Sequence, residues 1–300
     1  MATAAEPRPA ELPLPGGRPR ATVRLHPLLT GRATAPRAWF LREEGRLAWR
    51  KALGFGVSRD QWLTVPLPAF LVEHPGAGPF LIDTGLHPSV AVNPSQNLGR
   101  IGLLALKGLR MEPEQAVSAQ LRARGMQPAD VRLVVMTHMH IDHASAVAEY
   151  PQATFLVSRT EWEAATEARQ LHGYLRSQFD HAFDYRLLDF EGSDASSFAG
   201  FARSFDLFGD GSVRCVYTPG HTLGHMSVVL RTRAGEVLVA GDAIYLAATL
   251  ADSHLPHRSE DEHLFRRSLG ELRQYRSQTP DALIIPSHDW ELWEQLEPSY

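Results

Sequence analysis

The sequence contains a single cysteine, Cys215, so no disulfide bond can form within the chain. Structural disulfides belong to oxidising compartments, and a chain that cannot form one is expected in a reducing compartment. We therefore predict a cytoplasmic location. Cys215 lies inside the apolar run 213–217, which indicates a buried strand residue.

Long apolar runs and an excess of charge are also missing. No stretch approaches the roughly 18 uninterrupted apolar residues of a membrane-spanning helix, so we expect no membrane span. The formal net charge of −4 gives no overall basic field to attract nucleic acid. Residues 1–20 are rich in Pro, Ala and Arg and lack the apolar core of a secretory signal. We expect a disordered tail over 1–20 and a single catalytic domain over 21–300.

What the sequence does contain is a dense group of ligand-type side chains at residues 138–143, His-Met-His-Ile-Asp-His. Histidine accounts for 14 of the 300 residues, so three histidines and an aspartate in six positions rarely arise by chance. The apolar run 131–136 precedes the group and predicts a buried strand that ends there. A lone histidine would be read as an ordinary surface or core residue, but this density favours a metal site.

The spacing within this group suits two metal ions. His138 and His140 are two positions apart, so their side chains point the same way in an extended chain. Asp142 and His143 follow where the chain turns. Because imidazole and carboxylate suit zinc and its first-row neighbours, one segment can direct two imidazoles at one metal and a carboxylate plus an imidazole at another.

Other apolar runs predict strands on both sides of this group, with helices between them. The expected strands are 22–29, 65–72, 79–82, 153–157, 213–217, 227–231, 237–240 and 282–285. The expected helices are 99–110, 113–124, 144–150, 159–169 and 260–276. Residues 36–62 and 170–204 read as aromatic and irregular. Strand-rich halves with helices between them indicate two sheets packed face to face, with helices outside.

Ligand-type residues follow several of these strands. His138, His221, Asp242 and His288 each come just after an apolar run. Strand ends that converge on one edge of a sheet commonly build a binding site. We therefore expect these four side chains to lie together.

Five short motifs resemble those of the metallo-β-lactamase-fold hydrolases, over about residues 64–290. In order along the chain they are Leu-Ile-Asp-Thr-Gly at 81–85, the histidine group at 138–143, Thr-Pro-Gly-His at 218–221, Gly-Asp at 241–242 and Ser-His at 287–288. The resemblance implies an α/β (α+β) fold with four layers, an αββα sandwich, around a two-metal centre. It implies zinc first, with cobalt, manganese and iron as alternatives.

The resemblance also implies how the ligands are shared. One metal would be held by His138, His140 and His221. The other would be held by Asp142, His143 and His288, with Asp242 bridging the two.

Within this superfamily the chain is most similar to the N-acyl homoserine lactone lactonases, the quorum-quenching enzymes. These carry a tyrosine over the metals, three positions after the fourth-motif aspartate, where this chain has Tyr245 in Gly-Asp-Ala-Ile-Tyr. Residues 65–72 also resemble theirs. The alternative reading of Tyr245 is a half-buried aromatic at a strand end. The aromatic and apolar side chains of 36–62 and 99–106 are either core or the wall of an acyl-chain pocket.

The implied chemistry is hydrolysis of a lactone. Two cations about 3.5–4 Å apart can share a water molecule and lower its pKa towards neutrality. Asp142 and Asp242 offset only part of the metal charge, so the site would favour a bridging hydroxide that attacks the lactone carbonyl. Tyr245 could donate a hydrogen bond to the oxyanion, and Asp242 could relay a proton to the leaving oxygen. The expected catalytic residues are Asp142, Asp242 and Tyr245.

Several residues are expected to support the site. Asp83 should steady the histidine loop, because a metal-bound imidazole needs a partner on its other nitrogen. His225 and Asp289 could act in the same way or could simply pack. His172, on this reading, is a surface residue.

Other functions fit less well. A glyoxalase-II-like thioesterase would need a basic cluster near the C-terminus, but no Lys or Arg follows residue 280. A nuclease would need a basic face, and an oxygen-reducing diiron protein usually has a carboxylate at the position of His140. An inactive metal-binding scaffold is disfavoured by the complete ligand set. The expected partner is a small lactone rather than nucleic acid, and a homodimer is left open.

Overall fold

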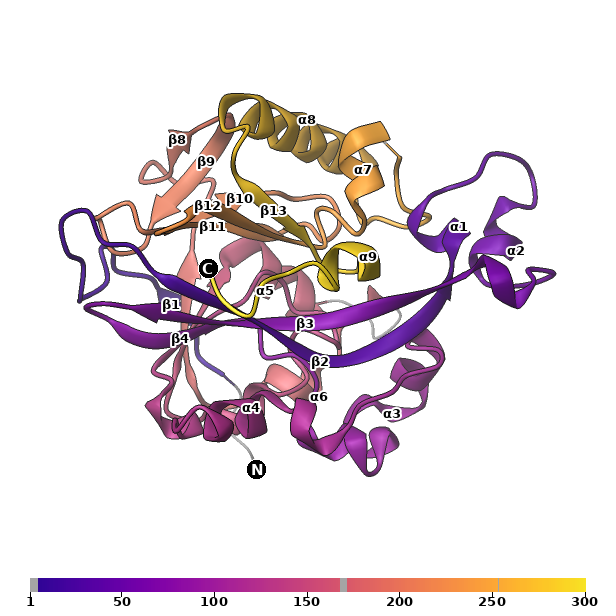
Figure 1. The fold of residues 1–300 in the computed structure, drawn as a ribbon, viewed down its shortest axis with the longest axis horizontal. Helices are drawn as coiled ribbons and strands as arrows, with labels where there is room; N and C mark the ends of the chain where they lie inside the picture. Colours follow the sequence, from indigo (N-terminus) through magenta and orange to yellow (C-terminus); the bar gives the residue numbers. More distant parts are fainter. Residues whose placement is uncertain (1–4, 168–171, 253) are drawn as a thin grey trace.

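The computed structural model describes residues 5–167, 172–252 and 254–300. Two sheets pack face to face, with helices on both outer sides (Figure 1). The predicted αββα sandwich is therefore confirmed.

The first sheet has the strand order β1-β7-β6-β5-β4-β3-β2. Its strands are β1 (Arg8–Pro9), β2 (Arg24–Pro36), β3 (Trp62–His74), β4 (Gly78–Ile82), β5 (Leu133–Val135), β6 (Thr154–Ser158) and β7 (Asp184–Leu188). The second sheet has the order β13-β12-β11-β10-β9-β8. Its strands are β8 (Ser196–Phe198), β9 (Phe201–Asp206), β10 (Val213–Tyr217), β11 (Met226–Thr232), β12 (Gly235–Gly241) and β13 (Leu283–Pro286).

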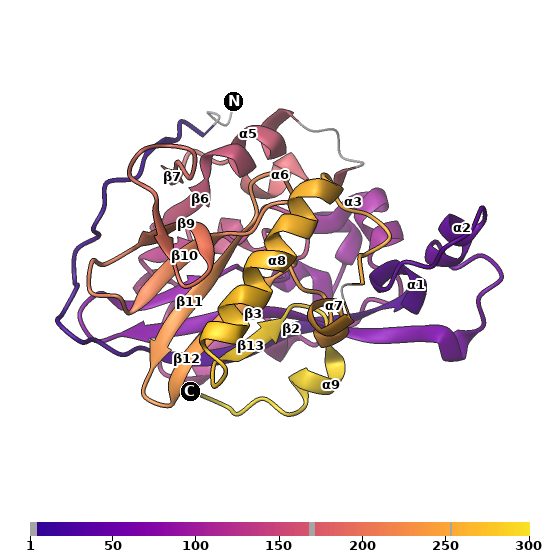
Figure 2. The same ribbon diagram turned by 90° about the horizontal axis from the view of Figure 1, so that it is seen from above.

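Most of the helices cover the two outer faces. Those nearer the first sheet or its edge are α1 (Arg37–Phe40), α2 (Ala48–Ala52), α3 (Pro94–Ala105), α4 (Val117–Ala123), α5 (Arg159–Glu167) and α6 (Arg176–Phe179). The later helices are α7 (Ala247–Asp252), α8 (Glu262–Gln278) and α9 (Trp290–Trp293), and α8 lies along the outer face of the second sheet (Figure 2). Away from the outer faces, α1 and α2 lie at the strand ends and α9 contacts β3. No helix in the described residues is long and apolar enough to span a membrane.

Alternating side chains of the central strands enter different cores. In β4, Ile82 packs between the two sheets, whereas Leu81 packs on the opposite face of its sheet. In β5, Val135 and Val134 divide in the same way. Successive residues of a strand point to opposite faces, so a strand buried on both sides must be apolar throughout. This is why the central strands were readable as continuous apolar runs.

Parallel pairing brings the ends of distant strands to one edge. Ile82 of β4 lies opposite Val135 of β5, so Asp83 and the histidine group emerge together. In the second sheet β12 and β13 are also parallel, and Gly241 lies opposite Pro286. The residues that follow these strands therefore meet in one place.

Three local predictions were wrong. The first strand, expected over 22–29, does not end there, because a register shift between Leu29 and Gly31 lets β2 continue to Pro36. The helix expected at 144–150 is only a short 3₁₀ turn at Val147–Glu149. The segment 170–204 is not irregular throughout, since it contains β7, β8 and β9. Pairing of β7 with β6 is a long-range contact that local propensity does not reveal.

The N-terminal segment also differs from the expectation of a disordered tail. Residues 1–4 lie outside the described part, but Arg8–Pro9 form β1, which pairs with β7. Leu12 and Leu14 then pack against the core between the sheets. Arg8 forms an ion pair with Asp184, with 2.8 Å between Nη2 and Oδ1. The prediction of a disordered tail was wrong for residues 5–20, because Leu12 and Leu14 pack against apolar residues of the rest of the fold.

Candidate metal centre

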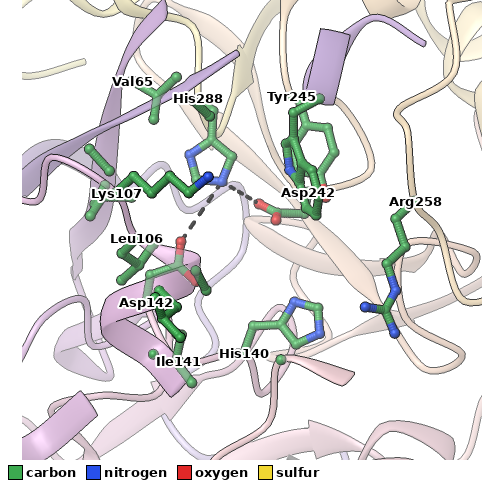
Figure 3. A pocket seen from close by; sticks show the side chains of 18 of the residues that line it. Val65, Leu106, Lys107, His140, Ile141, Asp142, Asp242, Tyr245, Arg258 and His288 are labelled. Carbon is green, nitrogen blue, oxygen red and sulfur yellow. Dashed lines mark ion pairs between the residues drawn. The ribbon is translucent and has the colours of Figure 1, made fainter. Parts of the chain in front are cut away.

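All of the side chains predicted to bind metal lie together at the edge where the strands end. They form two groups, in each of which the potential ligand atoms lie within 4.8 Å of one another. The first group is His138, His140, His221 and Asp242, and the second is Asp142, His143 and His288. Figure 3 shows His140, Asp142, Asp242 and His288 facing one another at the base of a pocket.

Asp242 lies between the two groups and directs one oxygen at each. Its Oδ2 is 3.2 Å from Nε2 of His221, in the first group. Its Oδ1 is 3.3 Å from Nε2 of His143 and 3.4 Å from Nε2 of His288, in the second. This is the arrangement that a bridging carboxylate requires.

The site has features that a pair of cations would satisfy. Nε2 of His221 lies 2.9 Å from Nδ1 of His140 and 3.3 Å from Nε2 of His138. Nε2 of His221 can either donate or accept one hydrogen bond, so a hydrogen bond explains one of these two contacts but not both. Nε2 of His143 and Oδ1 of Asp242 are buried and have no hydrogen-bond partner in the described part of the chain. Because buried polar atoms are nearly always paired, the residues fit a two-metal site.

In the first group the protonation states agree with a ligand role. Burial lowers the pKa of His140 to about 4 and lowers the pKa of His221 well below its usual value. Burial, assisted by the neighbouring His143, does the same to the pKa of His138. Burial opposes ionisation of Asp242, but the facing histidines, His288 foremost, hold its pKa well below the usual range. At neutral pH the first group therefore offers neutral imidazoles and a carboxylate.

As expected, the Asp83 side chain forms hydrogen bonds with the segment that carries the predicted histidine ligands. Its Oδ2 is 2.8 Å from Nδ1 of His143, and its carboxylate also accepts hydrogen bonds from the backbone N–H and the hydroxyl of Thr137, both at 2.7 Å. The backbone of Asp83 has a φ of 57°, in the left-handed region that few non-glycine residues adopt. The surrounding contacts hold this conformation, which directs the carboxylate at the loop.

His225 supports Asp242 through a defined chain of hydrogen bonds. Its Nε2 accepts from the backbone N–H of Asp242 at 3.0 Å, so its Nδ1 carries the proton. That nitrogen lies 2.9 Å from the Thr218 hydroxyl, which contacts Ser227 at 2.8 Å, and Ser227 donates to the Ala240 carbonyl. Burial lowers the pKa of His225 to about 3, which keeps the ring neutral. His225 therefore supports the site and is not simply packing.

One support comes from a residue that the sequence did not suggest, and Asp289, for which support and packing were both left open, serves as a helix cap. Nδ1 of His288 lies 3.0 Å from the carbonyl oxygen of Pro66 on β3, so this carbonyl fixes the ring and leaves Nε2 facing the carboxylates. Asp289, in turn, caps α9 by accepting from the backbone N–H of Leu292 and also accepts from the N–H of Ala247. The Pro66 contact spans 222 residues, and no local signal could have revealed it.

Tyr245 is buried between two of the predicted ligands. Its ring stacks on His288 with centroids 5.4 Å apart, and its hydroxyl lies 2.8 Å from Nδ1 of His221. Burial and the charges of Asp242 and Asp142 raise the pKa of Tyr245 well above its usual value, so the phenol remains protonated. The contact with a ligand histidine was not anticipated from the sequence.

A pocket of about 580 Å³ opens above these residues. Both segments expected to form an acyl-chain wall line it, including Trp39 and Leu53 from 36–62 and Leu104 from 99–106. Val65, Leu106 and Lys107 lie on one side, and Arg258 lies on the other (Figure 3). His172, predicted to be a surface residue, is exposed and lies at the pocket wall. The pocket is thus mainly apolar, with the predicted metal ligands at its base and the charged side chains of Lys107 and Arg258 on opposite sides.

Comparison with known proteins gives consistent results. A family profile described as the Metallo-beta-lactamase superfamily matches residues 65–288. N-acyl homoserine lactonase AttM of Rhizobium radiobacter is 32% identical over 237 residues, covering 78% of this chain and 85% of that protein. N-acyl homoserine lactonase AiiA of Bacillus thuringiensis subsp. kurstaki is 28% identical over 234 residues, covering 76% of this chain and 83% of that protein.

A solved structure shows the same fold. It is an N-acyl homoserine lactone hydrolase with the product N-hexanoyl-L-homoserine bound at its catalytic metal centre. The TM-score is 0.73 at 23% identity, with 92% of this chain and 97% of that chain covered.

Proposed function

Because this chain belongs to the metallo-β-lactamase superfamily and is a hydrolase, we propose that it opens the lactone ring of N-acyl homoserine lactones. The observation that carries this proposal is the combination of two ligand groups, joined by Asp242, with a largely apolar pocket directly above them. The names of the relatives support the choice of substrate.

We propose that His138, His140 and His221 hold one divalent metal ion, and that Asp142, His143 and His288 hold the second. Asp242 would bind both. Zinc suits this set of imidazole and carboxylate ligands, with cobalt, manganese and iron as alternatives. When bound, such a pair of cations lowers the pKa of a water molecule and polarises the substrate carbonyl.

The protein side chains then have distinct roles. His221 must present Nε2 to its metal, so Nδ1 carries the ring proton and donates to the Tyr245 oxygen 2.8 Å away. The phenolic hydrogen of Tyr245 is then free to donate to the oxygen of the substrate carbonyl as negative charge develops there. We propose that Asp142 and Asp242 orient the reacting groups, and that Asp242 accepts a proton from the attacking water and passes it to the departing ring oxygen.

The pocket would hold the acyl chain. Leu53, Leu104 and Leu106 form apolar walls around the cavity. Burying a methylene group contributes about 0.8 kcal/mol, so these walls favour substrates that carry an acyl chain over a bare lactone. The lactone ring would lie at the polar base beside Tyr245.

A pH-stat panel tests this function on protein loaded with zinc. The substrates are homoserine lactones of several acyl lengths, simple lactones and glutathione thioesters, and each hydrolysis releases acid that the titration measures. We expect homoserine lactones to give the highest kcat/KM. Preference for the thioester would instead identify a glyoxalase-II-like enzyme, and hydrolysis of none would contradict the proposal.

We also propose a cytoplasmic protein that forms a homodimer and has one catalytic domain, made of residues 21–300 together with the N-terminal strand β1. The single cysteine supports the location. Exposed Leu47, Trp49 and Phe55 in and beside α2 support the dimer, because such clusters are uncommon on monomers. Light scattering on wild type and Trp49→Glu measures the mass, and a monomeric wild type would contradict the dimer.

A further inference from the structure

Glu161, in the first turn of α5, is a buried carboxylate outside all five motifs. Its side chain is 0% exposed. Oε1 accepts a hydrogen bond from the backbone N–H of Met139 at 2.8 Å, and Oε2 accepts one from the Thr222 hydroxyl at 2.6 Å. Met139 lies between His138 and His140, while Thr222 directly follows His221. One carboxylate thus joins the two loops that carry the first ligand group.

We propose that Glu161 is a positioning residue that holds these two loops at the separation needed for the first metal ion. The inference rests on the proposed metal centre. At the base of the loops, a backbone bond from Met226 to Thr137 already joins the strands. Glu161 joins the same two loops closer to the ligand residues. Among those residues are His138 and His221, which are 83 positions apart in the sequence.

The close packing around Glu161 shows that this connection is built into the fold. A Cβ atom added at Gly224 would lie 2.0 Å from the backbone nitrogen of Glu161, so only glycine lets the His221 loop approach α5 so closely. A buried carboxylate is costly unless its oxygens are paired, and here each oxygen has a specific donor. Burial raises the pKa of Glu161 to about 7, and the bonds from Thr222 and Met139 oppose that shift.

Glu161 differs from the other supports in what it should affect. Asp83 contacts His143 in the second group, and Pro66 contacts His288 in that same group. Glu161 instead bonds Met139 and Thr222, the residues directly beside the three imidazoles of the first group. Its loss should therefore weaken one metal site of the two.

The test compares Glu161→Ala, Glu161→Gln and Thr222→Val by metal content and by the visible spectrum of cobalt-loaded protein, each followed during chelator competition. Loss of an outer hydrogen-bond partner typically weakens metal affinity by about 10–100-fold. We expect Glu161→Ala to lose one equivalent of cobalt first, with that site weakened about 10–100-fold, and Thr222→Val to do so to a smaller extent. Glu161→Gln should retain near-normal binding, because its amide oxygen can accept from Met139 and its NH₂ can donate to Thr222.

Glu271→Ala is the matched control. Glu271 is a half-buried carboxylate on α8 that accepts from the backbone N–H of Ala202 at 3.4 Å. It should change the stability of the metal-free protein without changing the cobalt spectrum or the order of metal release.

Three results would overturn the inference. Glu161→Ala could fold and release both metals as wild type does, which would make Glu161 a packing residue. Glu161→Gln could lose metal as readily as Glu161→Ala does, which would exclude a connection made through hydrogen bonds. If Glu161→Ala does not fold, unchanged release from Thr222→Val would reject the connection. Wild type that binds fewer than two metals would instead refute the proposed metal centre itself.

Discussion

Replacing Tyr245 with phenylalanine removes one hydroxyl group and leaves every proposed metal ligand in place. The hydroxyl lies 2.8 Å from Nδ1 of His221. The ring is held between His221 and Phe40, with edge contacts at centroid distances of 5.4 and 5.5 Å, and it stacks on His288. These contacts do not involve the hydroxyl, so the phenylalanine ring should occupy the same position.

Two effects should follow, and their sizes can be compared. The catalytic effect is loss of a donor to the developing oxyanion, worth up to about 2.7–4 kcal/mol, or roughly 10²–10³-fold in kcat. Two cations would share this task, so we expect a fall in kcat of roughly 10–1,000-fold. The structural effect is an unpaired Nδ1–H on buried His221, which costs about 1–3 kcal/mol and should weaken metal binding. Excess metal removes the structural effect and leaves the catalytic one.

The assay is therefore lactone hydrolysis at saturating zinc, with metal content measured on the same samples. The loss should appear in kcat and not in KM, because the bond strengthens only as charge develops. Tyr275→Phe is the control, since that buried hydroxyl donates to Glu236 at 3.0 Å outside the pocket. If Tyr245→Phe turns over lactone like wild type at full metal loading, Tyr245 only packs and supports His221.

Three further predictions concern the metal centre and pH. His138→Ala should remove one metal and reduce hydrolysis by orders of magnitude, which elemental analysis and the lactone assay check together. Asp242→Ala should disable both sites, whereas Asp83→Ala should weaken metal retention by about 10–100-fold, and equal small losses in a chelator assay would contradict these roles. Glu161 has a folded pKa of about 7 against an ordinary value of 4.5, so the folded state binds its proton more tightly and this group should reduce stability as pH rises through that interval. Urea unfolding of metal-free protein at pH 5 and 8 should show that Glu161→Gln loses this part of the pH dependence.

The sequence alone was sufficient for the architecture and for the grouping of the site. Strands such as 213–217 are buried on both faces, so they read as apolar runs whatever surrounds them. The ligand-type residues come directly after such runs, and chemistry restricts the residue types that can bind metal. His138, His140, Asp142 and His143 lie within six positions, so local geometry already brings them together.

The tertiary structure decided which residues support those ligands. The contact between Pro66 and His288 joins positions 222 residues apart, and Glu161 reaches Thr222 across 61 residues. A carboxylate in the first turn of a helix is usually solvated and favours the helix dipole, so its sequence context gave no reason to place Glu161 beneath the histidine loops. The N-terminal strand Arg8–Pro9 is ordered for a similar reason, because it pairs with a strand near residue 186. Hydrogen bonds between distant segments depend on how the sheets pack, and no local pattern of residues predicts that packing.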